Sequence, residues 1–177
     1  CFGLPLLRLD IRQESTRHAE TMSAITRYLG LGDYMAWDET ARQQFLIAEL
    51  ANPRPLLPSH IWHTNQSPLF NDEVMEVLAT FKMLAEQPSE ALGAYVISMA
   101  HQASDVLLVK LFMHKAEMSN PMRVVPLFET FDDLANAPDC LRALLTLPIY
   151  CELINGQQEV MIGYSDSTKD AGLLAAA

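Results

Sequence analysis

Polar and charged side chains gather at the ends of four short apolar segments of the sequence. The four groups are Asp10, Arg12, Gln13 and Glu14; His101, Gln102 and Ser104; Glu129, Thr130, Asp132 and Asp133; and Ser165, Asp166, Ser167 and Lys169. Because parallel α/β folds bind ligands at the carboxyl ends of their strands, four such groups would converge on one site. Any single group could instead cap a helix, since Ser, Thr and Asp favour that position. Together the four groups favour a site.

Glu129 and Asp166 are the candidate metal ligands. Both are predicted to follow neighbouring strands, and neither has a Cys or a plausible His pair close by in the sequence. Carboxylate oxygens in this setting suit a hard cation that keeps some of its waters and binds substrate oxygens. The pattern therefore predicts Mg²⁺ or Mn²⁺ rather than Zn²⁺.

The histidines are weaker candidates for a metal site. His60 and His63 flank Trp62 in a Pro-rich stretch, but this spacing without further ligands indicates surface residues. The other three histidines have no partner that can be recognised from the sequence: His18, His101 and His114.

Arg12 is the candidate anion ligand of the first group. Side chains alternate along a strand, so Arg8, Asp10 and Arg12 would share one face. Asp10 can neutralise one arginine and leave the other for a phosphate or carboxylate, which the planar guanidinium fits well. A structural ladder of ion pairs explains the same pattern. Lys169 is a second candidate cation, although its place at the start of a predicted helix also permits a plain surface lysine.

The apolar pattern predicts the elements that would position these groups. Four strands are predicted, each rich in Val, Ile, Leu or aromatic residues: Leu4–Ile11, Ala94–Met99, Val124–Phe128 and Val160–Tyr164. Their near-continuous apolar character is typical of parallel strands buried on both faces. With helices between them, the fold class is α/β, predominantly helical. We expect a partial parallel β-barrel, about half of an eight-stranded one, with helical insertions. An open sheet remains the alternative.

Capping residues predict where several helices begin and end. The first helix is expected to end at Gly30, and Asp38 and Asn71 are expected to begin the next two. Later helices are predicted to open at Ser104 and to lie near Asp139–Leu145. Lys110 lies on one of these helices, outside the four polar groups, so its charge is expected to matter little to the chemistry.

Composition narrows the class of protein. The chain has 177 residues, half of them apolar, and a formal net charge of −10, which argues against binding to nucleic acid or an anionic membrane. Three cysteines without a CxxC pair fit a reducing compartment. No uncharged apolar run approaches the ~20 residues that span a bilayer. The lack of an initiator Met and the apolar end at Ala177 predict that residues 1–177 are one incomplete segment.

Longer motifs resemble phosphoenolpyruvate carboxylase. The run Val160-Met-Ile-Gly-Tyr-Ser-Asp-Ser-Thr-Lys-Asp-Ala-Gly172 is similar to the active-site signature of that family. Three further segments look like the family in the same order: Leu9–His18, Ala94–Ala100 and Pro126–Leu134. The resemblance covers essentially the whole chain but only about a fifth of a typical family subunit. It implies that residues 1–177 are a single incomplete segment of the family's barrel catalytic domain.

The resemblance implies a function and roles for four residues. The family is a lyase that adds bicarbonate to phosphoenolpyruvate and forms oxaloacetate and phosphate, through carboxyphosphate and a metal-bound enolate. Glu129 and Asp166 would hold Mg²⁺ or Mn²⁺, while Arg12 and Lys169 would bind substrate and act in catalysis. The resemblance also implies a cytoplasmic, homotetrameric parent enzyme. The catalytic histidine and the glycine-rich phosphate loop would lie outside this chain, so we expect the fragment alone to be inactive.

Two other functions fit parts of the pattern. Another Mg²⁺-dependent barrel enzyme that handles phosphoenolpyruvate or pyruvate could also place a Glu and an Asp at strand ends, but the run Tyr164–Lys169 argues against it. A non-catalytic regulatory module would be expected to lose Arg12, Glu129 or Asp166, and all three are present.

Overall fold

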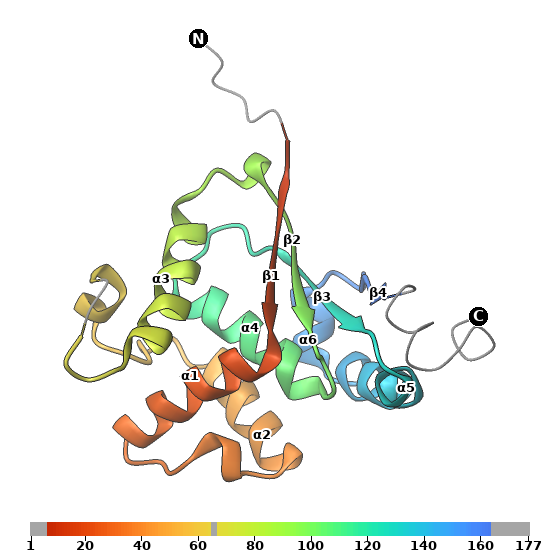
Figure 1. Cartoon of the computed structure of the whole chain (residues 1–177), viewed down its shortest axis with the longest axis horizontal. Coiled ribbons are helices and arrows are strands. Elements are labelled where there is room, and N and C mark those ends of the chain that lie inside the picture. Colours follow the sequence, from red (N-terminus) through yellow and green to blue (C-terminus); the bar gives the residue numbers. More distant parts are fainter. Residues whose placement is uncertain (1–6, 65–66, 164–177) are drawn as a thin grey trace.

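A computed structural model describes residues 7–64 and 67–163 of the chain. Its centre is a parallel sheet of four strands in the order β1-β2-β3-β4 (Figure 1). The strands are β1 (Leu9–Glu14), β2 (Leu92–Ser98), β3 (Arg123–Phe128) and β4 (Met161–Ile162). The predicted parallel arrangement is therefore confirmed for all four strands. Consecutive strands are neighbours, an order that is compatible with part of a barrel.

Helices make up most of the connecting chain. Three helices lie between β1 and β2: α1 (Ser15–Tyr28), α2 (Glu39–Leu50) and α3 (Asp72–Glu86). The later connections contain α4 (Ala103–Lys115), then α5 (Phe131–Leu145) and α6 (Pro148–Leu153). Three short 3₁₀ helices complete the connections: η1 (Tyr34–Ala36), η2 (Ser59–His63) and η3 (Ser89–Ala91). The α/β class and the helical insertion after the first strand are as predicted.

Local capping signals place several helix boundaries correctly. The side chains of Asp38 and Asn71 accept hydrogen bonds from the backbone N–H groups of Ala41 and Val74, at 2.8 and 3.0 Å. Gly30 follows the end of α1 with a φ of +72°, a conformation that glycine adopts without strain. The helix predicted near Asp139–Leu145 is longer than expected and begins at Phe131, where Thr130 caps it.

Strand boundaries differ more from the prediction. β1 runs to Glu14 instead of ending at Ile11, so Arg12 lies within the strand rather than after it. Side chains of β1 and β4 are largely exposed, whereas those of β2 and β3 are mostly buried. The expectation that all four strands are buried on both faces is therefore wrong for the two outer strands. An outer strand has a neighbour on one side only, and it tolerates polar residues that an inner strand would not.

The sheet has two different faces. One face joins the large apolar core with the helices, where Tyr95 stacks on Phe81 of α3, and Phe81 in turn packs against Phe112 of α4. The other face carries a small separate cluster of buried residues: Ala94, Val96, Val125 and Leu127. Arg12 lies beside Val96 in the β1–β2 register. Since paired residues of neighbouring strands project to the same side, Arg12 projects from the face with the small cluster.

Candidate functional site

Arg12 and Glu129 meet at the edge of the sheet where the strands end. Glu14, Ser98 and Phe128 are the last residues of β1, β2 and β3, and we call this the carboxyl edge. A guanidinium nitrogen of Arg12 lies 2.6 Å from Oε1 of Glu129, although the residues are 117 positions apart. The Arg12 side chain is 55% exposed and that of Glu129 is 15% exposed. This edge therefore presents a cation and a carboxylate, with the arginine open to solvent.

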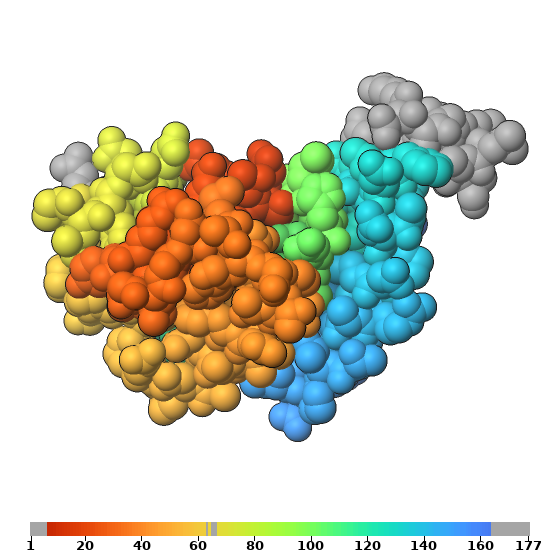
Figure 2. Space-filling view, turned by 90° about the horizontal axis from the view of Figure 1, so that it is seen from below, coloured from red at the N-terminus to blue at the C-terminus, as the bar shows by residue number. Residues whose placement is uncertain are grey.

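The segments that follow the first three strands lie next to one another. Figure 2 views the molecule from below Figure 1, which is the side toward which these strands run. The red residues around the end of β1, the green residues after β2 and the cyan residues after β3 adjoin along one rim (Figure 2). Three of the four predicted polar groups therefore converge. The fourth group, with Asp166 and Lys169, lies outside the described residues.

The backbone around Glu129 is held by the start of α5. Oδ2 of Asp133 accepts hydrogen bonds from the backbone N–H groups of Glu129 and Thr130, at 3.1 and 2.9 Å. The Thr130 side chain in turn accepts from the Asp133 N–H, which completes a capping box. Thr130 and Asp133, which resemble simple helix caps in the sequence, therefore also hold the backbone of Glu129, a candidate metal ligand.

Gly163 lies close against Glu129 from the direction of β4. Its backbone N–H donates to the carbonyl of Phe128 at 3.1 Å. A Cβ atom at this glycine would lie 3.2 Å from Cγ of Glu129, tighter than an ordinary van der Waals contact. A side chain at this position would therefore require the Glu129 side chain to shift by a few tenths of an ångström.

His101 and Asp133 form a second contact along the carboxyl edge. Nδ1 of His101 lies 2.6 Å from Oδ1 of Asp133, whose side chain is fully buried. Burial raises the pKa of Asp133, but hydrogen bonds from Thr130 and Glu129 and the nearby His101 outweigh it and hold that pKa below its ordinary value. Asp133 is therefore a charged structural group that links the end of β2 to α5. The sequence shows no recognisable partner for His101, because its partner Asp133 lies in a distant element.

Met99 is a residue of the carboxyl edge that sequence reasoning missed. It follows β2, between the strands that carry Arg12 and Glu129, and has a φ of +54°. A left-handed backbone is uncommon for a residue with a long side chain. The Ser15 hydroxyl donates a 2.6 Å hydrogen bond to the Met99 carbonyl and thereby ties β2 to the start of α1. Nothing in the residue type of methionine signals this conformation.

Asp10 does not pair with Arg12. Its Oδ1 accepts the backbone N–H of Ala94 at 2.7 Å, next to the irregularity in register between Leu9 and Ile11. A Cβ atom at Gly93 would lie 2.2 Å from the same oxygen. The Asp10 carboxylate therefore fastens β1 to β2, and Glu129 is the carboxylate that Arg12 contacts.

His18 is buried behind β1 and supports the strand from the core side. Its Nε2 lies 2.8 Å from the hydroxyl of Tyr95 and 3.1 Å from Oε1 of Gln13. Burial, with a smaller contribution from Arg17, lowers the pKa of His18 to about 3. The ring is therefore neutral at physiological pH and acts in packing and hydrogen bonding. Its partner Tyr95 is 77 positions away and likewise cannot be recognised from the sequence alone.

The described residues contain one of the two predicted metal ligands. Within residues 7–64 and 67–163, no three carboxylate, imidazole or thiol side chains gather closely enough to hold a metal by themselves. Glu129 nevertheless offers oxygen donors at a position that a cation, the Arg12 guanidinium, already contacts. A hard divalent ion fits this donor type. The metal role of Glu129 and Asp166 stays a prediction, as do the substrate roles of Arg12 and Lys169.

Comparison with known proteins decides the family. The family model for phosphoenolpyruvate carboxylase matches residues 1–177. The chain belongs to the phosphoenolpyruvate carboxylase family. Proteins named phosphoenolpyruvate carboxylase are 53% identical to it over 177 residues in Shewanella sediminis, 57% over 176 in Stutzerimonas stutzeri and 58% over 177 in Alcanivorax borkumensis.

These relatives are much longer than the chain. The alignments cover 99–100% of the chain but only 19–20% of each relative. The chain therefore spans about a fifth of the length of the carboxylases that it matches. Over the described residues, no helix combines the length and apolar character needed to cross a bilayer.

Proposed function

We propose that this chain supplies part of the catalytic site of an enzyme that carboxylates phosphoenolpyruvate with bicarbonate. The products are oxaloacetate and phosphate. The observation that supports this function best is the meeting of Arg12 and Glu129 at the carboxyl edge, in a chain of this family. The predicted anion ligand and one predicted metal ligand come from distant parts of the sequence and lie in contact.

Glu129 and Asp166 would hold the divalent ion, Mg²⁺ or Mn²⁺. When bound, such an ion supplies positive charge to substrate oxygens on which negative charge develops. Glu129 suits this task because the cap of α5 holds its backbone and the Arg12 guanidinium holds its carboxylate. A fixed carboxylate loses little conformational freedom when it binds a cation.

Arg12 would bind an anionic group of the substrate. One of its N–H groups contacts Glu129, and a guanidinium carries several more donors in one plane. The side chain is more than half exposed, so these donors can reach phosphate or carboxylate oxygens. Arg12 would thereby position substrate next to Glu129 and neutralise part of its charge. Lys169 would place a second positive charge against bicarbonate or a phosphate oxygen.

We propose further that the sheet forms part of a closed barrel in a cytoplasmic, homotetrameric parent enzyme. The strand order and the parallel pairing support the barrel. The family resemblance of the signature around Asp166 supports the cellular and oligomeric setting. The isolated chain would be inactive, because the catalytic histidine and the glycine-rich phosphate loop of the family have no counterpart among its motifs.

Charge-removing variants of the two carboxylates test the function. We expect Glu129→Gln and Asp166→Asn, in a full-length carboxylase that carries this segment, to lower oxaloacetate formation and to weaken Mn²⁺ binding in a direct titration. The amides keep the shape of the side chains but lose the charge that holds the metal. Asp132→Asn, a change at an exposed residue near the same edge, is the matched control. Normal Mn²⁺ affinity in both site variants would refute the metal assignment.

A further inference from the structure

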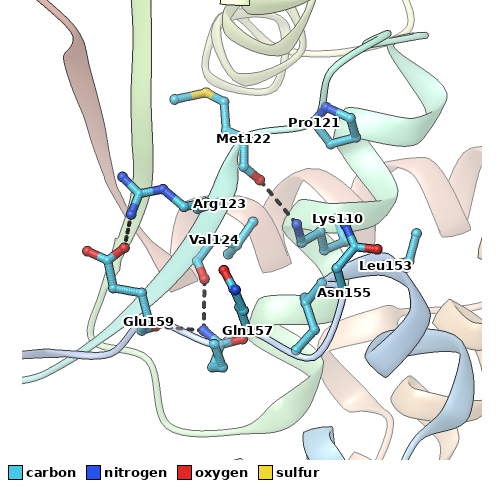
Figure 3. Close-up of a pocket in the computed structure, with 11 residues that line it drawn as sticks. Lys110, Pro121, Met122, Arg123, Val124, Leu153, Asn155, Gln157 and Glu159 are labelled. Carbon is cyan, nitrogen blue, oxygen red and sulfur yellow. Dashed lines mark hydrogen bonds and ion pairs between the residues drawn. The ribbon is translucent and has the colours of Figure 1, made fainter.

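A cavity lies at the opposite end of the sheet from the carboxyl edge. It has a volume of about 650 Å³ and lies between α4, the start of β3 and the chain after α6 (Figure 3). Residues that line it include Lys110, Met122, Arg123, Asn155, Gln157 and Glu159. Arg123 begins β3 and Glu129 follows its last residue, so the two sites are roughly 20 Å apart at the usual rise of a strand. The cavity is therefore separate from the proposed carboxylation site.

Lys110 brings a buried positive charge to this cavity. The residue is only 7% exposed, and its Nζ donates to the carbonyl of Met122 at 3.1 Å. Figure 3 shows the ammonium directed toward that carbonyl at the wall of the cavity. Within the described part of the chain, this is its only hydrogen bond, and it forms no ion pair with a carboxylate. Burial lowers the pKa of Lys110 to about 8.

A buried ammonium with one acceptor is poorly satisfied. An ammonium carries further N–H donors, and each loses its water on burial. Buried charges in proteins are usually paired, so the missing partner of Lys110 indicates a place for an anion. The position of Lys110 outside the carboxyl edge is as expected from the sequence. Its burial, however, is not apparent from the sequence.

The other polar groups of the cavity show which anion would fit. Arg123 forms an ion pair with Glu159, and these opposite charges offset each other. The ammonium of Lys110 therefore gives the residues that line the cavity one net positive charge. The side-chain amides of Asn155 and Gln157 are exposed and make no hydrogen bond among the described residues, so both can donate to a ligand.

We propose that this cavity binds a small molecule through a single carboxylate, with Lys110 as its counter-ion. One carboxylate balances the net charge of the lining, and its oxygens can accept from the ammonium and from a side-chain amide. A phosphate dianion would leave negative charge uncompensated in a chain whose formal charge is already −10. The site does not depend on the carboxylation chemistry at the other end of β3.

Site-resolved acylation of Lys110 tests the proposal in a full-length carboxylase that carries this segment. The reagent is an N-hydroxysuccinimide ester, the probe is propionate, and peptide mass spectrometry follows each lysine. A bound carboxylate that raises the pKa of Lys110 by one unit cuts its reactive neutral fraction about tenfold at a pH below that pKa. We therefore expect saturable protection of Lys110 of about this size and none of Lys82, which lies on α3 outside the cavity.

Variants give a second measurement that does not involve turnover. Lys110→Met keeps most of the side-chain volume and should remove one saturable propionate-binding event from a calorimetric titration. Lys82→Met should retain it. Lys110 that stays unlabelled without propionate at a pH above 8 would show that the cavity is closed to solutes and would overturn the proposal. Equal protection of Lys82, no protection of Lys110, or equal protection by inorganic phosphate would overturn it too.

Discussion

Replacing Arg12 by lysine distinguishes the contribution of this residue to turnover from its contribution to folding stability. The Arg12–Glu129 contact is short, at 2.6 Å, but the arginine side chain is 55% exposed. Ion pairs that are open to water contribute about 0–1 kcal/mol to folding, and lysine keeps the charge. We therefore expect the free energy of unfolding to change by less than about 1 kcal/mol.

Turnover should respond very differently to the same substitution. Lysine is a point charge without the planar fork that can contact two oxygens at once. Loss of one well-placed donor for developing negative charge typically costs about 10²–10³ in turnover, and we expect Arg12→Lys to fall in this range. Its effect should thus lie almost entirely on catalysis.

Two measurements check this dissociation. Urea unfolding of the chain gives the stability, and oxaloacetate formation at saturating Mg²⁺ in a full-length carboxylase carrying this segment gives the turnover. Arg142→Lys is the matched control, because Arg142 is also an exposed arginine paired with a carboxylate, that of Asp139, on the outside of α5. Near-normal turnover of Arg12→Lys would remove Arg12 from the mechanism. A loss of stability well above 1 kcal/mol would show that its main role is structural.

Three further substitutions test features of the fold. Gly163→Ala should lower turnover and Mn²⁺ affinity together, because the new Cβ would lie 3.2 Å from Cγ of Glu129; unchanged Mn²⁺ binding in a titration would contradict this. Lys110→Met should be more stable than the wild type at pH 7. The difference in unfolding free energy between the two proteins should shrink by about 3 kcal/mol as the pH rises from about 8 to 10.5. Urea unfolding at each pH measures it. The sign follows because the unfolded chain binds more protons than the folded chain in this window, so the wild type alone gains stability there. Ser15→Ala should cost about 1 kcal/mol of unfolding free energy by removing the hydrogen bond to the Met99 carbonyl, and an unchanged urea midpoint would show that this bond does not hold β2 to α1.

Signals that act over a few residues were readable in the sequence. Asp38 and Asn71 cap helices whose N–H groups lie three positions further along, and Gly30 ends α1 through its own backbone conformation. The alternation of apolar segments with helical patterns likewise predicted a parallel sheet. The end of β1 was misplaced, because polar residues within an outer strand look like the start of a loop.

Only the tertiary structure shows which distant residues meet. The sequence identified Arg12 and Glu129 as separate candidates, and the register of three strands brings them within 2.6 Å. The partners of His18 and His101 also come from other elements. Lys110 resembles an ordinary helix lysine in the sequence, yet packing of β3 and the chain after α6 against α4 buries it. Residue type and spacing determine local conformation, whereas burial and long-range pairing depend on how whole elements pack together.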